Sequence, residues 1–240
     1  MTGLLKRAVT VYREKGVPSL LRESSRFAFK KTIRPHLPCR DYPKIRGISV
    51  MASGRCTKMF DNIIGVDFSW PDHHKEPNCN FISKYVHEGD SVVIVGGGYG
   101  ITSVVAGQQV GKGGKVFIYE AAKEIVDDLL STLEQNGVSK QTTVKHAVVG
   151  DAIDLKGLPG NAKSVSPSNL PSCEIAELDC EGAEVNIIPH LTRDINKIIV
   201  ETHPSKGAST DKVKAILRKN DWEIIESAPD RSSGEVLVAG

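Results

Sequence analysis

Apolar and polar positions follow a regular rhythm from residue 91 to the end of the chain. Short apolar runs that suit buried strands lie at 91–95, 115–119, 142–149, 173–178, 197–200, 222–225 and 235–239. Helical patterns separate the early runs, whereas the last two follow each other without a helix between them. The pattern therefore predicts seven strands.

Two of the helical patterns are well marked. Over residues 121–137 an apolar stripe recurs at helical spacing, and Gly137 suits the C-terminal cap. Over residues 209–220, Ser209 or Thr210 is placed to cap the first turn. Such alternation predicts an α/β fold, with a doubly wound, mostly parallel Rossmann-like sheet covered by helices on both faces. Ligands of such sheets bind at the carboxyl ends of the strands.

The first 40 residues differ from the rest in charge. They hold ten Lys or Arg but only Glu14 and Glu23 as acidic residues, although the whole chain has a net charge of only +2. Their apolar positions recur at helical spacing, which predicts a basic extension of two amphipathic helices. Three roles stay open: packing on the main domain or a partner subunit, contact with an anionic membrane surface, and binding of nucleic acid. Nucleic acid is the least favoured, because the segment shows no RNA-binding signature.

We expect three parts in the chain: the extension 1–40, a connecting segment 41–75 and a Rossmann-like domain 76–240. The connecting segment contains two candidate short strands, "GISVM" and "NIIGVDF". His73 and His74 are adjacent, so their side chains share neither a strand face nor a helix face. This pair is therefore not expected to bind a metal.

Composition favours a cytoplasmic protein. No apolar stretch approaches the roughly 20 residues that span a bilayer, and the N-terminus lacks the apolar core of a signal peptide. Peripheral attachment at the inner membrane face stays an option through residues 1–40. The cysteines are odd in number, scattered and without a CxxC pair, which predicts free thiols rather than disulfides or a zinc site. They are Cys39, Cys56, Cys79, Cys173 and Cys180.

The candidate chemistry begins with the sequence "VVIVGGGYGITS" at residues 92–103. Gly96, Gly98 and Gly100 directly follow the first strand of the regular region, so backbone can approach a ligand there, and the next helix directs its N-terminus at it. A dinucleotide-binding GxGxxG motif would need glycine where Ile101 stands, and no Lys-Ser/Thr pair follows to make a P-loop. GxGxG after a strand is shared by S-adenosylmethionine-dependent methyltransferases. The predicted contacts of this loop are Gly96, Gly97, Gly98, Tyr99, Gly100 and Thr102.

Carboxylates also end the next two strands. Glu120 stands 24 residues after the first glycine of the loop, where it can accept hydrogen bonds from both ribose hydroxyls. Asp151 ends the third strand and can accept from the adenine amino group, while Val149 or Ala152 packs on the ring. Together with Ala121, these residues complete a predicted S-adenosylmethionine site.

The fourth and fifth strands end in two acidic motifs. "ELDCEGAE" at 177–184, "IIVETHP" at 198–204 and "EPNCNFISKYVHEGDSVVIVGGGYG" at 76–100 resemble the FkbM-type methyltransferase family. The similarity covers roughly residues 76–226. Two positions depart from the family pattern. Ile94 stands where an acidic residue is usual, and Glu177 stands where a Lys is usual.

The resemblance implies transfer of a methyl group to a hydroxyl of a sugar, glycan or natural-product acceptor. Methyl transfer needs an aligned acceptor and a group that takes its proton. The candidates are Asp179, which also borders the predicted cofactor site, Glu181, Glu201 and His203. Histidine titrates near neutrality, so a His203 base would give a rate that rises through about pH 6 to 7. Nothing in the sequence requires a metal.

Three other functions stay open at this point. A nicotinamide-dependent oxidoreductase is disfavoured by the glycine spacing, and an RNA methyltransferase would use the basic N-terminus on phosphates. A catalytically silent binding protein is suggested by Ile94. The sequence specifies neither the acceptor nor the oligomeric state, and it leaves residues 163–172 as either a disordered connection or a lid.

Overall fold

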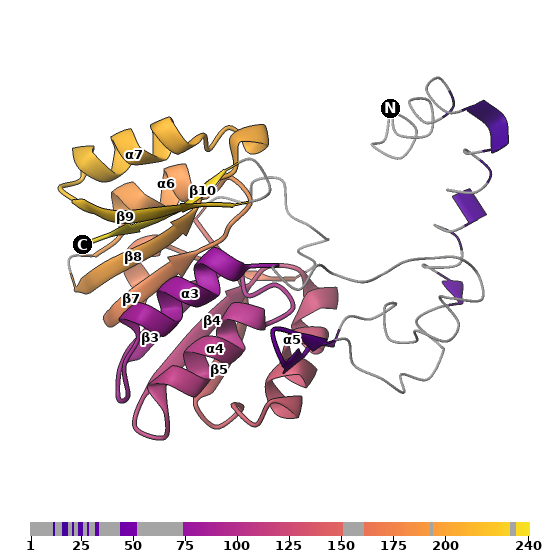
Figure 1. The fold of residues 1–240 in the computed structure, drawn as a ribbon, viewed down its shortest axis with the longest axis horizontal. Helices are drawn as coiled ribbons and strands as arrows, with labels where there is room; N and C mark the ends of the chain where they lie inside the picture. The colour runs from indigo at the N-terminus through magenta and orange to yellow at the C-terminus, as the bar shows by residue number, and fades with distance from the viewer. Residues whose placement is uncertain are drawn as a thin grey trace. The chain divides into compact units, whose positions relative to one another are not determined.

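The structure is a computed structural model that describes residues 44–51, 74–150, 161–192, 194–230 and 234–240, with isolated positions between residues 12 and 33. The chain divides into two units, and Figure 1 shows the sheet and the helices of the second. One comprises Met1–Pro43 and Ala52–Trp70, and the other comprises Lys44–Met51 and Pro71–Gly240. The second unit contains the sheet and every candidate site residue discussed below.

The described positions of the first unit include helical residues such as Tyr12, Leu21 and Ala28. The Thr32 hydroxyl donates a hydrogen bond to the Ala28 carbonyl at 2.8 Å, as in a helical turn. The two complete amphipathic helices, the "NIIGVDF" strand and His73 lie largely or wholly outside the described residues, so these expectations stay predictions. Among the described helices, none has the length and apolar character needed to cross a bilayer.

Eight strands form one sheet in the order β6-β5-β4-β3-β7-β8-β10-β9. All neighbouring pairs from β6 to β8 are parallel, and β10 runs antiparallel to β8 and β9. The mostly parallel sheet and the two closing strands are as predicted. The strands are β3 (Ser91–Val95), β4 (Lys115–Glu120), β5 (Thr142–Val149), β6 (Lys163–Val165), β7 (Cys173–Leu178), β8 (Ile195–Glu201), β9 (Ile224–Pro229) and β10 (Glu235–Ala239).

The additional strand is β6, at one edge of the sheet. It pairs with β5 through Ala147 opposite Lys163 and Val149 opposite Val165. A 3-10 turn, η2 (Pro167–Asn169), follows it. The beginning of segment 163–172 is therefore a strand. Because β6 has only three residues and is mostly exposed, it carries no apolar periodicity that a sequence could reveal.

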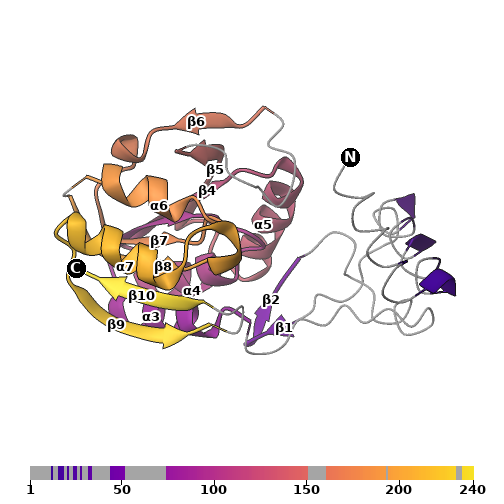
Figure 2. The same cartoon turned by 90° about the horizontal axis from the view of Figure 1, so that it is seen from above.

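Helices cover both faces of the sheet, as the views in Figures 1 and 2 show. Val93 and Val95 of β3 belong to the same buried cluster as Ile187 and Val213 on helices of one face. Since side chains alternate along a strand, Ile94 faces the other layer of helices. The helices are α3 (Glu76–Tyr85), α4 (Ile101–Val110), α5 (Lys123–Gln135), α6 (Glu184–Ile187) and α7 (Thr210–Lys219), with 3-10 turns η3 (Ile188–His190) and η4 (Pro204–Lys206).

The predicted caps are largely confirmed. Gly137 follows the C-cap of α5 with a φ of 72°, a left-handed conformation that glycine tolerates. The Ser209 hydroxyl, not that of Thr210, accepts the hydrogen bond of the Lys212 amide and caps α7. Gly137 thus marks where α5 ends, and Ser209 marks where α7 begins.

A short hairpin precedes the main sheet. Its strands β1 (Lys44–Ile45) and β2 (Ile48–Ser49) pair antiparallel, which confirms a strand within "GISVM". The Ser49 amide donates to the Asn136 side chain at 3.1 Å, and the Met51 amide donates to the Thr132 hydroxyl at 2.8 Å. The hairpin is thereby attached to the C-terminal half of α5.

Candidate functional site

The glycine loop between β3 and α4 is shaped mainly by close packing within the protein. A Cβ on Gly96 would lie 1.9 Å from the backbone oxygen of Asp179, and one on Gly97 would lie 2.5 Å from Ile118. Gly98 differs, since a Cβ there would meet no atom within 4 Å. Of these three glycines, only Gly98 has open space at the position of a Cβ.

Glu120, the last residue of β4, holds this loop in place. Its Oε2 accepts a hydrogen bond from the Gly98 amide at 2.8 Å, and its Oε1 accepts one from the Ala122 amide at 2.7 Å. The residue is only 7% exposed, and burial raises the pKa of its carboxyl group above the ordinary value. The two amides fix the carboxylate in one orientation, and each oxygen retains a further lone pair for a ligand hydroxyl.

A cavity opens beside Gly98 and Glu120 at the carboxyl ends of the strands. Its walls come from the ends of β3, β4, β5 and β7 and from the loops that follow them. Most of its exposed lining is apolar, and its carboxylates gather at these strand ends. Seven predicted site residues line it, namely Gly96, Gly98, Glu120, Ala121, Val149, Asp179 and Glu181.

The remaining predicted cofactor contacts are not among the described residues that line this cavity. Gly97 and Gly100 pack against side chains on β4 and α5. Tyr99 and Thr102 are not among the described residues that line the cavity, and Thr102 is buried near Glu177. Asp151 lies outside the described residues, so its predicted contact with adenine stays a prediction.

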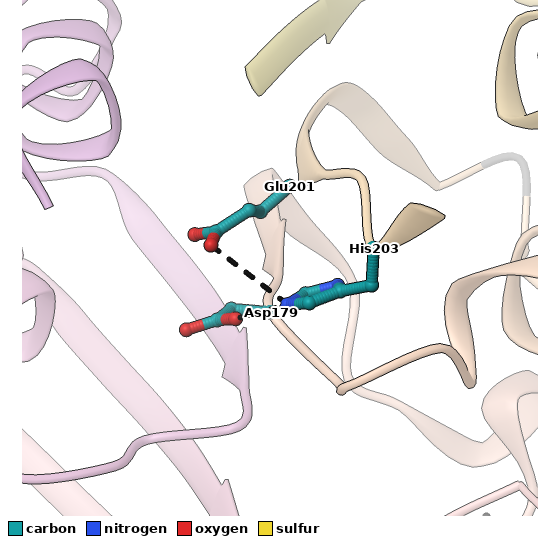
Figure 3. Close-up of side chains that lie close together, drawn as sticks. All are labelled: Asp179, Glu201 and His203. Carbon is teal, nitrogen blue, oxygen red and sulfur yellow. Dashed lines mark ion pairs between the residues drawn. The ribbon is translucent and has the colours of Figure 1, made fainter. Parts of the chain in front are cut away.

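A compact group of charged side chains lies at the ends of β7 and β8. Asp179 follows β7, and its amide donates to the Val95 carbonyl at 2.9 Å, which joins it to the end of β3. Glu201 is the last residue of β8, and His203 follows two positions later. The His203 Nε2 lies 3.4 Å from Asp179 Oδ1 and 3.8 Å from Glu201 Oε1 (Figure 3). The structure thus brings together three of the four predicted acceptor-side residues.

The fourth residue, Glu181, faces the cavity from the turn after β7. Its φ of 54° is left-handed, a costly conformation for a residue with a side chain, of the kind often found at functional sites. Its Oε2 lies 3.3 Å from the Lys206 ammonium. Glu184 begins α6 and is buried, and it accepts a hydrogen bond from the Cys180 amide at 2.8 Å.

Sequence reasoning missed Lys75. Its ammonium lies 2.6 Å from Asp179 Oδ2 and 2.6 Å from Glu201 Oε2, and it therefore bridges the two strand ends. Burial by itself would lower the pKa of Lys75, but the two carboxylates outweigh it and hold the pKa above the ordinary value. Burial would likewise raise the pKa of Asp179, but Lys75 and His203 keep it below its usual range. No motif in the sequence marks Lys75, because its partners are distant in the chain.

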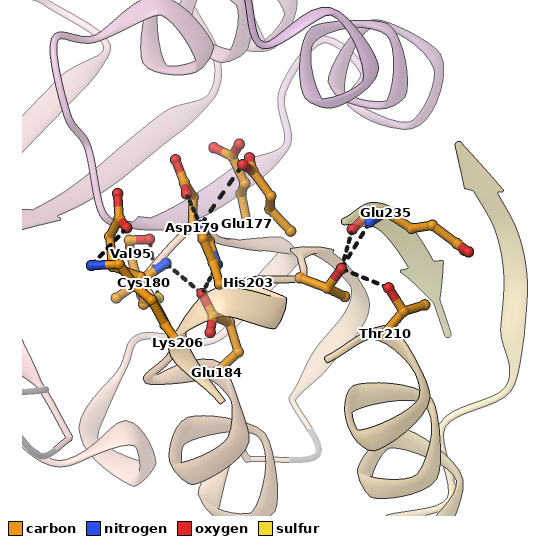
Figure 4. A network of polar contacts seen from close by, with 12 residues as sticks. Val95, Glu177, Asp179, Cys180, Glu184, His203, Lys206, Thr210 and Glu235 are labelled. Carbon is orange, nitrogen blue, oxygen red and sulfur yellow. Dashed lines mark hydrogen bonds and ion pairs between the residues drawn. The ribbon is translucent and has the colours of Figure 1, made fainter. Parts of the chain in front are cut away.

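His203 is held as a cation by the carboxylates around it. Its Nδ1 lies 2.9 Å from Glu184 Oε1, and its Nε2 faces Asp179 (Figure 4). Burial would lower the pKa of His203, but the negatively charged Asp179 and Glu184 beside the ring outweigh it and raise the pKa to about 9. A pKa of about 9 favours the protonated ring at neutral pH.

Glu177 and Ile94, the two departures from the FkbM pattern, are neighbours in the sheet. They pair in register between β7 and β3, and both are buried. Glu177 accepts a hydrogen bond from the Asn78 side chain of α3 at 3.1 Å. Burial, followed by the charge of Asp179, raises the pKa of Glu177 to about 7. Because Glu177 contacts Asn78 of α3, its carboxyl group lies on the side of that helix, and Glu177 does not line the cavity.

Solved methyltransferase structures share this architecture. An S-adenosylmethionine-dependent methyltransferase from Aquifex aeolicus superposes with a TM-score of 0.51, at 14% identity, over 71% of this chain and 93% of that chain. An S-adenosylmethionine-dependent O-methyltransferase from Thermotoga maritima superposes with a TM-score of 0.50, at 17% identity, over 77% of this chain and 71% of that chain. The chain thus has the Rossmann-like fold of S-adenosylmethionine-dependent methyltransferases.

No protein-family model matches the sequence, and no curated protein matches it either. The resemblance to the FkbM-type family therefore stays a prediction that rests on the motifs quoted above.

The different surroundings of Gly96 and Gly98 predict different responses to alanine. Both residues have positive φ, so alanine at either costs about 1–2 kcal/mol from the left-handed backbone. Gly96→Ala also forces a Cβ against the Asp179 backbone, which adds about 1–3 kcal/mol of overpacking. Urea unfolding should therefore show a larger loss for Gly96→Ala. Equal losses for the two variants would mean that the loop packs differently.

His203 should titrate far above its ordinary range. A histidine whose pKa is raised to about 9 stabilises the fold fully below about pH 6.5, and this contribution is lost as the pH rises through about 9. NMR of the histidine ring carbons, with the signal assigned by its absence in His203→Gln, measures the midpoint directly. A midpoint between about pH 6 and 7 would show that the carboxylates do not hold the proton.

Proposed function

We propose that this protein is a methyltransferase that uses S-adenosylmethionine to methylate a hydroxyl group. The observation that carries the proposal is the joint position of Gly98 and Glu120. An open glycine and a buried, oriented carboxylate meet in one cavity at the carboxyl ends of the strands. In Rossmann-like sheets this is the position where a ribose is bound.

The described residues fit such a cofactor. Glu120 would accept hydrogen bonds from the ribose hydroxyls, because its two oxygens retain lone pairs after binding the loop amides. Val149 and Ala121 would contact the adenine ring, and Gly98 leaves room for the methionine portion. When bound, S-adenosylmethionine supplies an electrophilic methyl group on its sulfonium.

The strand-end group supports oxygen as the methylated atom. Asp179 lies at the border between the cavity and the charged group, so an acceptor beside it would be close to the cofactor site. Its carboxylate and that of Glu201 can accept the hydrogen bond of an acceptor hydroxyl and orient it. Burial and the charge of Asp179 raise the pKa of Glu201, which makes Glu201 the better proton acceptor of the two.

His203 has a different part in this scheme. Because its pKa is raised to about 9, its imidazolium balances the carboxylates at neutral pH and keeps them in place. A His203 base would give a rate that rises through about pH 9, in place of the pH 6 to 7 expected for an ordinary histidine. A Glu201 base would give a rate already at its plateau at lower pH.

The acceptor class comes from the resemblance to the FkbM-type family. We propose a hydroxyl of a sugar, a glycan or a natural product, which suits a site whose polar groups are carboxylates able to accept from hydroxyls. The basic residues 1–40 would bring the protein to an anionic membrane surface if the acceptor is lipid-linked.

Calorimetric titration with S-adenosylmethionine tests the proposal. The wild-type protein should bind, and Glu120→Gln should lose about 1.5–3 kcal/mol of binding free energy because a charged acceptor of hydrogen bonds becomes neutral. Glu124→Gln, an exposed change in the first turn of α5, is the matched control and should bind like the wild type. Absence of binding by the folded wild-type protein would overturn the proposed function.

A further inference from the structure

The Lys75 ammonium occupies a position that suits a cation. It lies 2.6 Å from one oxygen of Asp179 and 2.6 Å from one oxygen of Glu201. The same two carboxylates and His203 each offer one ligand atom, and these atoms all lie within 4.8 Å of one another. A carboxylate pair with an imidazole is a donor set that suits ions such as Mn²⁺.

The surroundings of His203 orient its ring toward this position. Glu184, which is fully buried, lies against Nδ1 at 2.9 Å, so Nε2 is turned toward Asp179 and Glu201. A carboxylate on the far nitrogen is the usual partner of a metal-binding histidine. This contact does not involve Lys75, and it orients His203 toward the position that the Lys75 ammonium occupies.

The backbone of Lys75 indicates that the ammonium is held there by its partners. Lys75 is the N-cap of α3 and has a φ of 57°, a left-handed conformation that a residue with a side chain rarely adopts. Such a conformation persists only where surrounding interactions fix it. Its side chain is 17% exposed, and both carboxylates that it contacts are also largely buried.

We propose that Lys75 is a built-in cation, and that it competes with a divalent metal ion for one position between Asp179, Glu201 and His203. The wild-type protein then needs no metal there, because the ammonium already neutralises the carboxylate pair. Removal of the ammonium takes the lysine partner from the two buried carboxylates and opens the position to a divalent ion.

In the proposed methyltransferase, Lys75 is a positioning residue on the acceptor side. It neutralises the two strand-end carboxylates and fixes them while they accept the hydrogen bond of the acceptor hydroxyl. This role rests on the proposed function. The competition with a metal ion does not, since it requires neither cofactor nor acceptor.

Mn²⁺ binding, followed by electron paramagnetic resonance on the full chain, tests the proposal. Lys75→Met keeps most of the unbranched side chain and removes the charged ammonium. This variant should bind one Mn²⁺ with a dissociation constant of about 10⁻⁴ to 10⁻³ M, the range of weak protein sites for hard cations. The wild-type protein should bind at least about tenfold more weakly. Lys75→Met combined with Asp179→Asn should lose the site.

Lys84→Met is the matched control. Lys84 also contacts a carboxylate, Glu226, at 2.5 Å, but its side chain is 55% exposed and lies outside the group. The Lys84→Met variant should bind Mn²⁺ like the wild-type protein. Equal affinity in the wild type and in Lys75→Met, or no binding by folded Lys75→Met, would overturn the proposal.

Loss of the ammonium can also unfold the protein, so circular dichroism accompanies the titration. Lys75→Gln is the second variant, because its amide can still donate to one carboxylate. If both variants are unfolded without metal, Mn²⁺ must restore their folded spectrum. Failure to restore it contradicts the proposal. None of these results depends on whether S-adenosylmethionine binds, so they are separate from the test of the proposed function.

Discussion

The contact of the Lys75 ammonium with Asp179 and Glu201 is the interaction on which the candidate site depends. It joins the start of α3 to the ends of two parallel strands. Buried carboxylates that lack a partner are strongly destabilising, and loss of one member of a buried pair costs about 3–5 kcal/mol. The ammonium between the two carboxylates therefore lets them lie side by side at these strand ends.

A second constraint shapes the other half of the site. The glycine loop packs so closely against β4 and β7 that Gly96 and Gly97 have no room for a side chain. This packing places the Gly98 amide against Glu120, which in turn fixes the carboxylate at the cavity wall. Asp179 belongs to both halves, since its backbone contacts the loop and its side chain contacts Lys75. The glycine loop and the charged group at the strand ends are thus connected through one residue.

Much of this fold could be predicted because its signals are local. Apolar runs mark the long strands, and Ser209 and Gly137 mark helix ends, since each acts within one turn of chain. Parallel topology then places Glu120, Asp179 and Glu201 at one edge of the sheet. Strand β6 was not predicted, because its three mostly exposed residues show no apolar periodicity.

The charge state of the site could not be predicted in the same way. Lys75 lies 104 residues from Asp179 and 126 from Glu201 along the chain, so no local sequence pattern predicts their contact. The high pKa of His203 likewise follows from carboxylates on other elements that folding brings around the ring. The sequence indicated which side chains gather at the strand ends, but their protonation depends on the tertiary contacts.

A double-mutant cycle on Lys75 and Asp179 tests the central interaction most directly. Urea unfolding of the wild type, Lys75→Met, Asp179→Asn and the double variant gives the coupling free energy between the two side chains. The contact predicts a favourable coupling of about 1–3 kcal/mol, as for residues within one charged network. Additive losses, within about 0.5 kcal/mol, would show that Lys75 does not hold the strand ends together.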